Sequence, residues 1–241
     1  ARLADGSEHL FRATQGIVLA SGDYSAAPDL KAMLASPEVA PVDAVNPTAT
    51  GDGHRMALAI GATVVNGDIV RGPIMRFIAP TRPNILQKLR PTRWIAQCIA
   101  WSARHLPQWI LRPFLMSFLT TAVSPSVDLY REGGILVNNR GERFTDELGR
   151  PNQDTARQPD RVAWIVFDSV VAAKFSAWPY YISTAPGVAY AYLDDYRRNR
   201  PDIFHKADSI AQLAARMGVP AQGLERTLAQ YNAGERGERP A

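Results

Sequence analysis

Residues 131–147 read Arg-Glu-Gly-Gly-Ile-Leu-Val-Asn-Asn-Arg-Gly-Glu-Arg-Phe-Thr-Asp-Glu and contain the clearest structural pattern of the chain. The apolar run at 135–137 predicts a buried strand. The polar triplet at 139–141 predicts a turn, and Arg143-Phe144 predicts the start of a returning strand. A second buried strand is predicted at 162–167, after a polar loop.

Two amphipathic helices are predicted after this region. Asp208 or Ser209 caps the first, which stops at Gly218, and the second follows Pro220. Both helices have the pattern of structural elements, so no chemistry is assigned to them. The residues expected to face inward are Ile210, Leu213, Ala214 and Met217 in the first helix and Leu224, Leu228 and Tyr231 in the second.

The first seventy residues carry three further strand patterns. Strands are predicted at 7–14 and at 16–20, and the second is an apolar run that ends in the small turn Ser21-Gly22-Asp23. Such a turn often presents backbone to a ligand, although an ordinary strand and loop explains it equally well. A strand pair is predicted at 63–70, divided by the hairpin signal Asn66-Gly67.

A short helix is predicted between Thr50, its expected N-cap, and Gly61. Gly51 and Gly53 let the backbone come close to a ligand at the helix start, where free N–H groups favour oxygen-rich groups. The dinucleotide fingerprint is absent, because Met56 stands in place of its third glycine. The apolar face of this helix is expected to consist of Met56, Ala59 and Ile60.

The stretch at 80–125 differs from the rest, because aromatic residues and arginines alternate in it and prolines interrupt it. It is too interrupted to cross a bilayer as one helix. Two readings stay open: helices packed on the rest of the domain, or an amphipathic segment at a membrane surface. The residues concerned include Trp94, Trp101, Trp109, Phe114, Phe118, Arg82, Arg90, Arg93, Arg104, Arg112, Pro83, Pro91, Pro107 and Pro113.

Composition excludes several classes of protein. With 241 residues, of which 46% are hydrophobic, the chain can bury a real core in one large domain or two modest ones. The net charge of +4 comes with no recognisable nucleic-acid module, so no nucleic-acid partner is expected. The single cysteine, Cys98, excludes a disulfide framework and a cysteine-based metal site. We expect Cys98 to be buried and the protein to be cytoplasmic, with membrane association left open.

Three segments, in this order, resemble the FAD-dependent fumarate reductase and succinate dehydrogenase flavoprotein family, which includes 3-ketosteroid dehydrogenase-like members. They are Gly-Ile-Val-Leu-Ala-Ser-Gly-Asp at 16–23, Thr-Gly-Asp-Gly at 50–53 with Met56-Ala57, and Gly-Gly-Ile-Leu-Val-Asn at 133–138 followed by the Arg-Phe motif. The resemblance implies an internal fragment of mixed α/β and α+β fold. Residues 1–75 would be the C-terminal part of a split FAD-binding domain. Residues 76–241 would be a capping domain with a helical insertion at about 80–125.

The resemblance also implies the cofactor and the site. FAD is the expected cofactor, and Ala20, Ser21, Gly22 and Asp52 are the expected cofactor-binding residues. The expected catalytic residues are Arg150, Glu147 and Arg131, and no metal is expected. The implied reaction is CH–CH dehydrogenation, or the reverse ene reduction, on a small or moderately apolar substrate.

Several features depart from the family pattern. Asp23 stands where a second glycine is usual, no His-Pro-Thr motif occurs before Arg131, and the family's Glu and Arg pair survives only as Asp128 and Arg131. A small dicarboxylate substrate is therefore less favoured than a larger or more apolar one. The electron donor or acceptor stays unknown. The rival reading is a non-enzymatic module that binds a membrane or a partner through residues 80–125.

Overall fold

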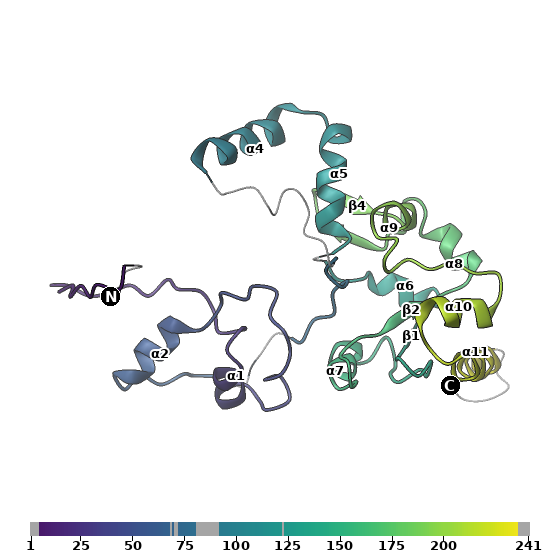
Figure 1. Ribbon diagram of the computed structural model, residues 1–241, viewed down its shortest axis with the longest axis horizontal. Helices are drawn as coiled ribbons and strands as arrows, with labels where there is room; N and C mark the ends of the chain where they lie inside the picture. Colours follow the sequence, from purple (N-terminus) through teal and green to yellow (C-terminus); the bar gives the residue numbers. More distant parts are fainter. Residues whose placement is uncertain (1–4, 68, 70–71, 81–91, 122, 236–241) are drawn as a thin grey trace. The chain divides into compact units, whose positions relative to one another are not determined.

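The structure is a computed structural model that describes residues 5–67, 69, 72–80, 92–121 and 123–235. Contacts between Cα atoms divide the chain into two compact units, Ala1–Val70 and Arg71–Ala241, which are described separately. Figure 1 shows the elements of each unit in the order of the sequence.

The first unit contains two short helices among its described residues, α1 (Pro28–Leu34) and α2 (Asp52–Ala59). Pro28 starts α1 because its missing N–H would be unpaired there in any case. Lys31 Nζ donates to Val42 O at 2.5 Å, which ties α1 to the following loop. Arg55 of α2 forms a bidentate ion pair with Asp29 of α1, with N···O distances of 2.7 and 2.8 Å.

The strands predicted at 7–14 and 16–20 are wrong for this structure. Ile17 and Val18 are 76% and 89% exposed and lie in an irregular segment. A strand needs a neighbour for its N–H and C=O groups, and no described residue of this unit pairs with residues 16–20. Apolarity without a partner therefore did not produce a strand.

The other local predictions in this unit hold in part. The cap of α2 is Gly51 in place of Thr50, and Gly61 follows the helix with a φ of +88°, as a stop residue should. The apolar face of Met56, Ala59 and Ile60 is exposed. Asn66 has a φ of +56° and Ile69 N donates to its carbonyl at 3.0 Å, so the turn is present, while the described residues of 63–70 form no strand. Residues 68 and 70 of that prediction lie outside the described residues.

The second unit is organised around two small antiparallel sheets. β1 (Ile135–Val137) pairs with β2 (Trp164–Val166), and β3 (Ser183–Ala185) pairs with β4 (Ala189–Ala191). The prediction for 135–137 is confirmed, because all three residues are buried. The turn at 139–141 is confirmed by the Gly141 N–H bond to Asn138 O at 3.0 Å, and the returning strand is reduced to a bridge between Val137 and Arg143.

The two predicted helices near the C-terminus are confirmed as α10 (Ile210–Met217) and α11 (Ala221–Glu235), which lie beside β1 and β2 in Figure 1. The Ser209 side chain caps α10, and Gly218 ends it with a φ of +71°. Their apolar faces form one core with the first sheet, made up of Ile135, Val137, Val166, Ala214, Met217, Val219 and Leu224.

A second core surrounds Phe175, which is fully buried. It joins β3 and β4 to parts of several helices. These helices are α5 (Gln108–Leu119), α6 (Val127–Arg131), α8 (Ser169–Lys174) and α9 (Leu193–Asn199). The short α7 (Pro151–Ala156) is bonded to the start of this unit, where Met75 N donates to Asn152 Oδ1 at 2.8 Å.

The predicted helical insertion contains α4 (Arg93–His105) and α5, with Pro107 between them. The helix α5 is packed, since Met116 and Leu119 are buried and Arg112 forms an ion pair with Asp195 at 2.6 Å. In contrast, α4 buries none of its side chains. Cys98 is therefore exposed, and its predicted burial is wrong because the packing of its helix buries none of the side chains of α4. Residues 81–91 of this prediction lie outside the described residues.

Candidate functional site

In the first unit, two of the segments predicted to bind the cofactor lie against each other. Gly53 at the start of α2 approaches Ser21 so closely that a Cβ atom on Gly53 would overlap Ser21 Oγ and lie 3.4 Å from Ser21 Cβ. Ala20, Ser21 and Gly22 are exposed, so their peptide groups are open to a ligand. The structure thus brings the 20–22 segment next to the helix that carries Asp52.

The start of α2 is shaped by a left-handed glycine. Gly51 has a φ of +74°, and a Cβ atom there would lie 2.8 Å from Tyr24 Cβ. No side chain caps the helix, so its first N–H groups have no side-chain partner. The exposed Asp52 carboxylate accepts a hydrogen bond from Thr50 Oγ1 at 3.0 Å and keeps acceptor capacity for a ligand.

A half-buried histidine adds a polar atom without a partner. His54 Nδ1 is buried and makes no hydrogen bond, while the ring packs edge-on against Tyr24 with 4.9 Å between centroids. Asp23 is turned toward Ser25, whose backbone N–H and hydroxyl lower the Asp23 pKa. Open peptide groups, an uncapped helix start and an unpartnered nitrogen fit a large polar ligand such as FAD.

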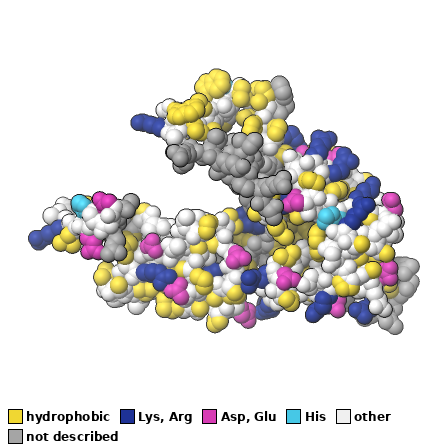
Figure 2. All heavy atoms as spheres, in the orientation of Figure 1, with side chains coloured by type: hydrophobic (Ala, Val, Ile, Leu, Met, Phe, Trp, Pro, Cys, Tyr) yellow, Lys and Arg dark blue, Asp and Glu magenta, His cyan; other side chains and the backbone are white. Residues whose placement is uncertain are grey.

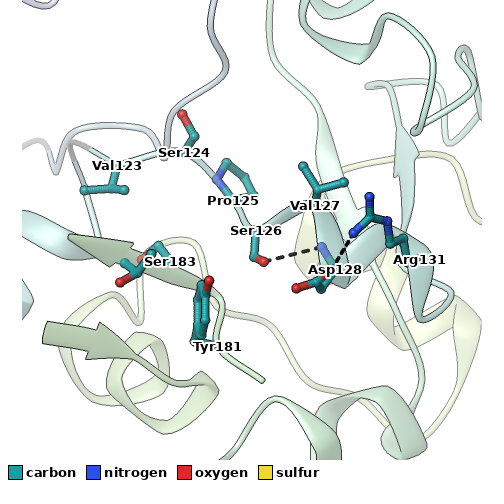
Figure 3. A pocket seen from close by; sticks show the side chains of 10 residues that line it. Val123, Ser124, Pro125, Ser126, Val127, Asp128, Arg131, Tyr181 and Ser183 are labelled. Carbon is teal, nitrogen blue, oxygen red and sulfur yellow. Dashed lines mark hydrogen bonds and ion pairs between the residues drawn. The ribbon is translucent and has the colours of Figure 1, made fainter. Parts of the chain in front are cut away.

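In the second unit, an open pocket of about 490 Å³ lies between the N-terminus of α6 and the β3 strand (Figure 3). Ser126 caps α6, and Arg131 Nη1 donates to Asp128 Oδ1 at 3.0 Å. Tyr181 and Ser183 stand opposite this pair in Figure 3. The Ser183 hydroxyl is already used, since it donates to Leu119 O at 2.8 Å. The charged groups of this pocket are those of Arg131 and Asp128, which pair with each other.

A neighbouring pocket of about 350 Å³ brings Arg131 and Glu147 together. Glu147 is buried and accepts the backbone N–H of Leu136 at 2.8 Å and the Arg143 guanidinium at 2.7 Å. Both carboxylate oxygens of Glu147 are thus occupied by the protein. The Tyr130 hydroxyl in the wall is buried without a partner; burial, and then the charge of Glu147, raise its pKa, so the phenol stays protonated.

Arg150 lies apart from both pockets. It immediately precedes α7, its side chain is exposed, and it lines neither pocket. Within the part of the chain that the structure describes, its guanidinium has no hydrogen bond or ion pair and can bind a substrate oxygen. The structure therefore brings together Arg131 and Glu147 but not Arg150.

Two residues of these pockets were missed by reasoning from the sequence. Arg143 was predicted as a strand start and as part of the motif that carries the resemblance, without a role in the site. Its ion pair with Glu147 forms outside a helix, where a spacing of four residues gives no signal for a pair. Tyr130 gave no signal, because its burial arises from packing of α6. Searched over the described residues, no cluster of His, Cys, Asp or Glu could hold a metal ion, and no helix is long and apolar enough to cross a membrane.

Comparisons with known proteins agree with this arrangement. Residues 1–74 match the family model of an FAD binding domain. A fumarate reductase of Schizosaccharomyces pombe is 29% identical over 61% of this chain and 22% of its own length. An NADH:acrylate oxidoreductase of Vibrio harveyi is 26% identical over 95% of this chain and 18% of its own length.

Among solved structures, the open conformation of a flavocytochrome c3 fumarate reductase matches with a TM-score of 0.54 and 23% identity, over 91% of this chain and 29% of that chain. The chain thus spans less than a third of each of these proteins. The fold is confirmed as part of an FAD-binding domain followed by a capping domain. This chain is therefore similar to part of the FAD-dependent fumarate reductase type of flavoprotein, and FAD is the cofactor that the match indicates.

Proposed function

We propose that this chain works as part of a longer FAD-dependent oxidoreductase that reduces a carbon–carbon double bond or performs the reverse dehydrogenation. The observation that carries the proposal is the match of residues 1–74 to an FAD binding domain, joined to a unit with accessible guanidinium groups. Fumarate and acrylate, the compounds in the relatives' names, both hold a double bond conjugated to a carboxylate. Such substrates need a cation to hold the carboxylate.

The residues proposed to hold the cofactor are Ala20, Ser21, Gly22 and Asp52. The first three offer exposed peptide groups. Asp52 offers an exposed acceptor carboxylate that suits the ribityl hydroxyls better than the pyrophosphate, because like charges repel. FAD, when bound, supplies hydride transfer. The chain contributes orientation and charge stabilisation.

The residues proposed to act on the substrate have different roles. Arg131 and Arg150 are exposed guanidinium groups that can bind a carboxylate or carbonyl oxygen through two N–H groups. A guanidinium is a poor acid, so Arg150 would pass a proton only with a carboxylate beside it in a closed site. Glu147 is a positioning residue in this proposal, since it holds Arg143 and the backbone of β1.

The test uses the full-length protein that contains this chain. Purified protein should show the absorbance of bound oxidised flavin, and the dithionite-reduced flavin should be reoxidised under anaerobic conditions by at least one member of a series of fumarate, acrylate and apolar enones. The 241-residue chain alone should not bind FAD tightly, as measured by quenching of flavin fluorescence. Full-length protein without any flavin would contradict the proposal.

A second candidate is a non-enzymatic module that binds a partner through residues 80–125. The observation in its favour is that α4 buries none of its side chains. The same flavin measurement separates the two candidates, since a binding module has no need of a reducible flavin. A bound flavin that conjugated alkenes reoxidise would leave only the oxidoreductase.

A further inference from the structure

Charge is distributed very unevenly along this chain. Between Asp68 and Asp128 there are eight Lys and Arg residues and no Asp or Glu. The rest of the chain therefore holds 19 of the 27 Lys and Arg against all 23 Asp and Glu, and carries a net negative charge. The positive charge of the protein thus belongs to residues 69–127. Within them the described cations are Arg76, Arg93, Arg104 and Arg112.

The helix α4, at the middle of this basic stretch, presents an apolar face to solvent. Trp94 is 66% exposed, Trp101 is 58% exposed and Ile99 is 54% exposed. Trp94, Cys98 and Trp101 follow one another at spacings of four and three residues, which places them on one side of the helix. Figure 2 shows the hydrophobic side chains gathered over this part of the molecule.

The remaining sides of α4 carry cations and no anion. Arg93 and Arg104 are three helical turns apart and so share one stripe next to the tryptophans. The following helix adds a second apolar pair, since Phe114 and Phe118 are 53% and 56% exposed and lie four residues apart. Both helices have too few residues, 13 and 12, to cross a bilayer.

From these observations we propose that α4 and the exposed edge of α5 bind the surface of a membrane that contains anionic phospholipids. The apolar face enters the boundary between headgroups and acyl chains, where tryptophan is favoured, and the arginines contact lipid phosphates. The absence of carboxylates from residues 69–127 removes the repulsion that an anionic surface would otherwise exert. This interaction is independent of the proposed reaction.

Other occupants fit the surface less well. A second copy of the chain would bring two segments together, each with eight cations and no anion, so their charges would repel. A nucleic acid would satisfy the arginines. However, Ile95 and Ile99 beside the tryptophans offer no hydrogen bond to a base, and they extend the aromatic face into an aliphatic one. A bilayer surface matches both the charge and the aliphatic face.

The experiment measures sedimentation of the 241-residue chain with large vesicles of phosphatidylcholine alone or with 30% phosphatidylglycerol. We expect binding to the anionic vesicles at low salt, much weaker binding at 0.5 M NaCl, and little binding to phosphatidylcholine. Cys98, the single cysteine, allows a polarity-sensitive fluorophore to be placed on the α4 face. Its emission should shift to shorter wavelength on anionic vesicles.

Variants assign the binding to α4. The double variant Arg93→Gln/Arg104→Gln should bind anionic vesicles about 25-fold more weakly, at roughly five-fold for each cation removed. Trp94→Ser/Trp101→Ser should weaken binding by about ten-fold or more. The matched control is Arg216→Gln/Arg226→Gln, which removes two exposed arginines from α10 and α11 and should leave binding nearly unchanged.

Two results would overturn the proposal. One is no sedimentation with anionic vesicles at low salt. The other is equal weakening in the control pair and the α4 pair, since binding would then follow net charge alone. Ultracentrifugation that showed a dimer, lost in Trp94→Ser/Trp101→Ser, without vesicle binding would assign the face to a second copy. The variants should keep the circular dichroism of the unmodified chain, because their side chains are exposed.

Discussion

Arg143 contacts the carboxylate of Glu147 through two nitrogens, with Nη2 at 2.7 Å from Oε2 and Nε at 3.1 Å from both oxygens. Glu147 is 5% exposed in its side chain and Arg143 is 26% exposed. The same carboxylate accepts the N–H of Leu136 at 2.8 Å, so it fixes the edge of β1. The pair therefore joins the Arg-Phe motif to the first sheet of the second unit.

We expect Glu147→Gln to lower the free energy of unfolding by about 2–3 kcal/mol, because the amide loses the ion pair and leaves Arg143 without its partner. Urea unfolding followed by circular dichroism measures the change. Glu142→Gln is the control, since Glu142 is 39% exposed and pairs with arginines at the surface. It should cost about 0.5 kcal/mol or less. Equal losses of unfolding free energy in the two variants would show that the buried ion pair stabilises the fold no more than a surface pair does.

The first sheet and the two C-terminal helices of the second unit could be predicted from sequence because their signals are local. The strand at 135–137, the turn at 139–141 and the cap Ser209 each depend on neighbouring residues and on one apolar face, and all three are present. The sequence also shows which face of α10 is apolar. These local patterns agree with the final structure because the apolar faces that they predict pack against one another in one core of the same unit.

The first unit could not be predicted in this way. Residues 16–20 have the composition of a buried strand, yet Ile17 and Val18 are exposed because a strand also needs a paired neighbour. The wrong prediction for Cys98 of the second unit has a related cause, because its apolar neighbours on α4 gave no information about whether that helix is packed. The free hydroxyl of Tyr130 depends on tertiary packing, which no sequence period reports.

We expect Gly51→Ala to destabilise the first unit by about 3 kcal/mol. A Cβ there costs about 1–2 kcal/mol for the left-handed backbone, and overlap with Tyr24 Cβ at 2.8 Å adds a similar amount. Gly61→Ala is a matched control, since Gly61 has a φ of +88° but open space around it and should cost only the backbone part. Amide hydrogen exchange of residues 28–59 measures the loss of stability in both variants. If the two variants lost protection equally, the close approach at Gly51 would be irrelevant.

Acid should loosen the contact between α1 and α2. The Arg55 guanidinium lowers the pKa of Asp29 from its ordinary value of 3.8 to about 2. A lowered pKa gives stability that is complete above pH 4 and is lost as the pH falls toward 2. Asp29 is well exposed, so the effect is small and should fall with added salt. The protection of α1 amides, taken relative to the intrinsic exchange rate at each pH, should therefore fall between pH 4 and pH 2 by more than it does in Asp29→Asn. An equal fall in the variant would exclude the ion pair as the cause.

The last prediction concerns the two accessible arginines in the full-length flavoprotein. Arg150 has an exposed guanidinium without a partner among the described residues, whereas Arg131 donates to Asp128 at 3.0 Å and lines both pockets. A residue that binds a substrate carboxylate through two N–H groups cannot be replaced by lysine without loss of one of them. A residue that contributes only positive charge can be replaced by lysine without such a loss.

We expect Arg150→Ala to lower kcat/KM for the natural substrate by about 100-fold or more and Arg150→Lys to recover only a small part of that loss. Arg131→Ala should raise KM with a smaller change in kcat, because Arg131 stays paired with Asp128 and contributes mainly to binding. The absorbance of bound flavin serves as the control for folding in every variant. Wild-type turnover in Arg150→Ala, with flavin retained, would make Arg150 a loop residue. The acid would then have to be sought in groups such as Tyr181, which faces Asp128 and Arg131 across the pocket in Figure 3.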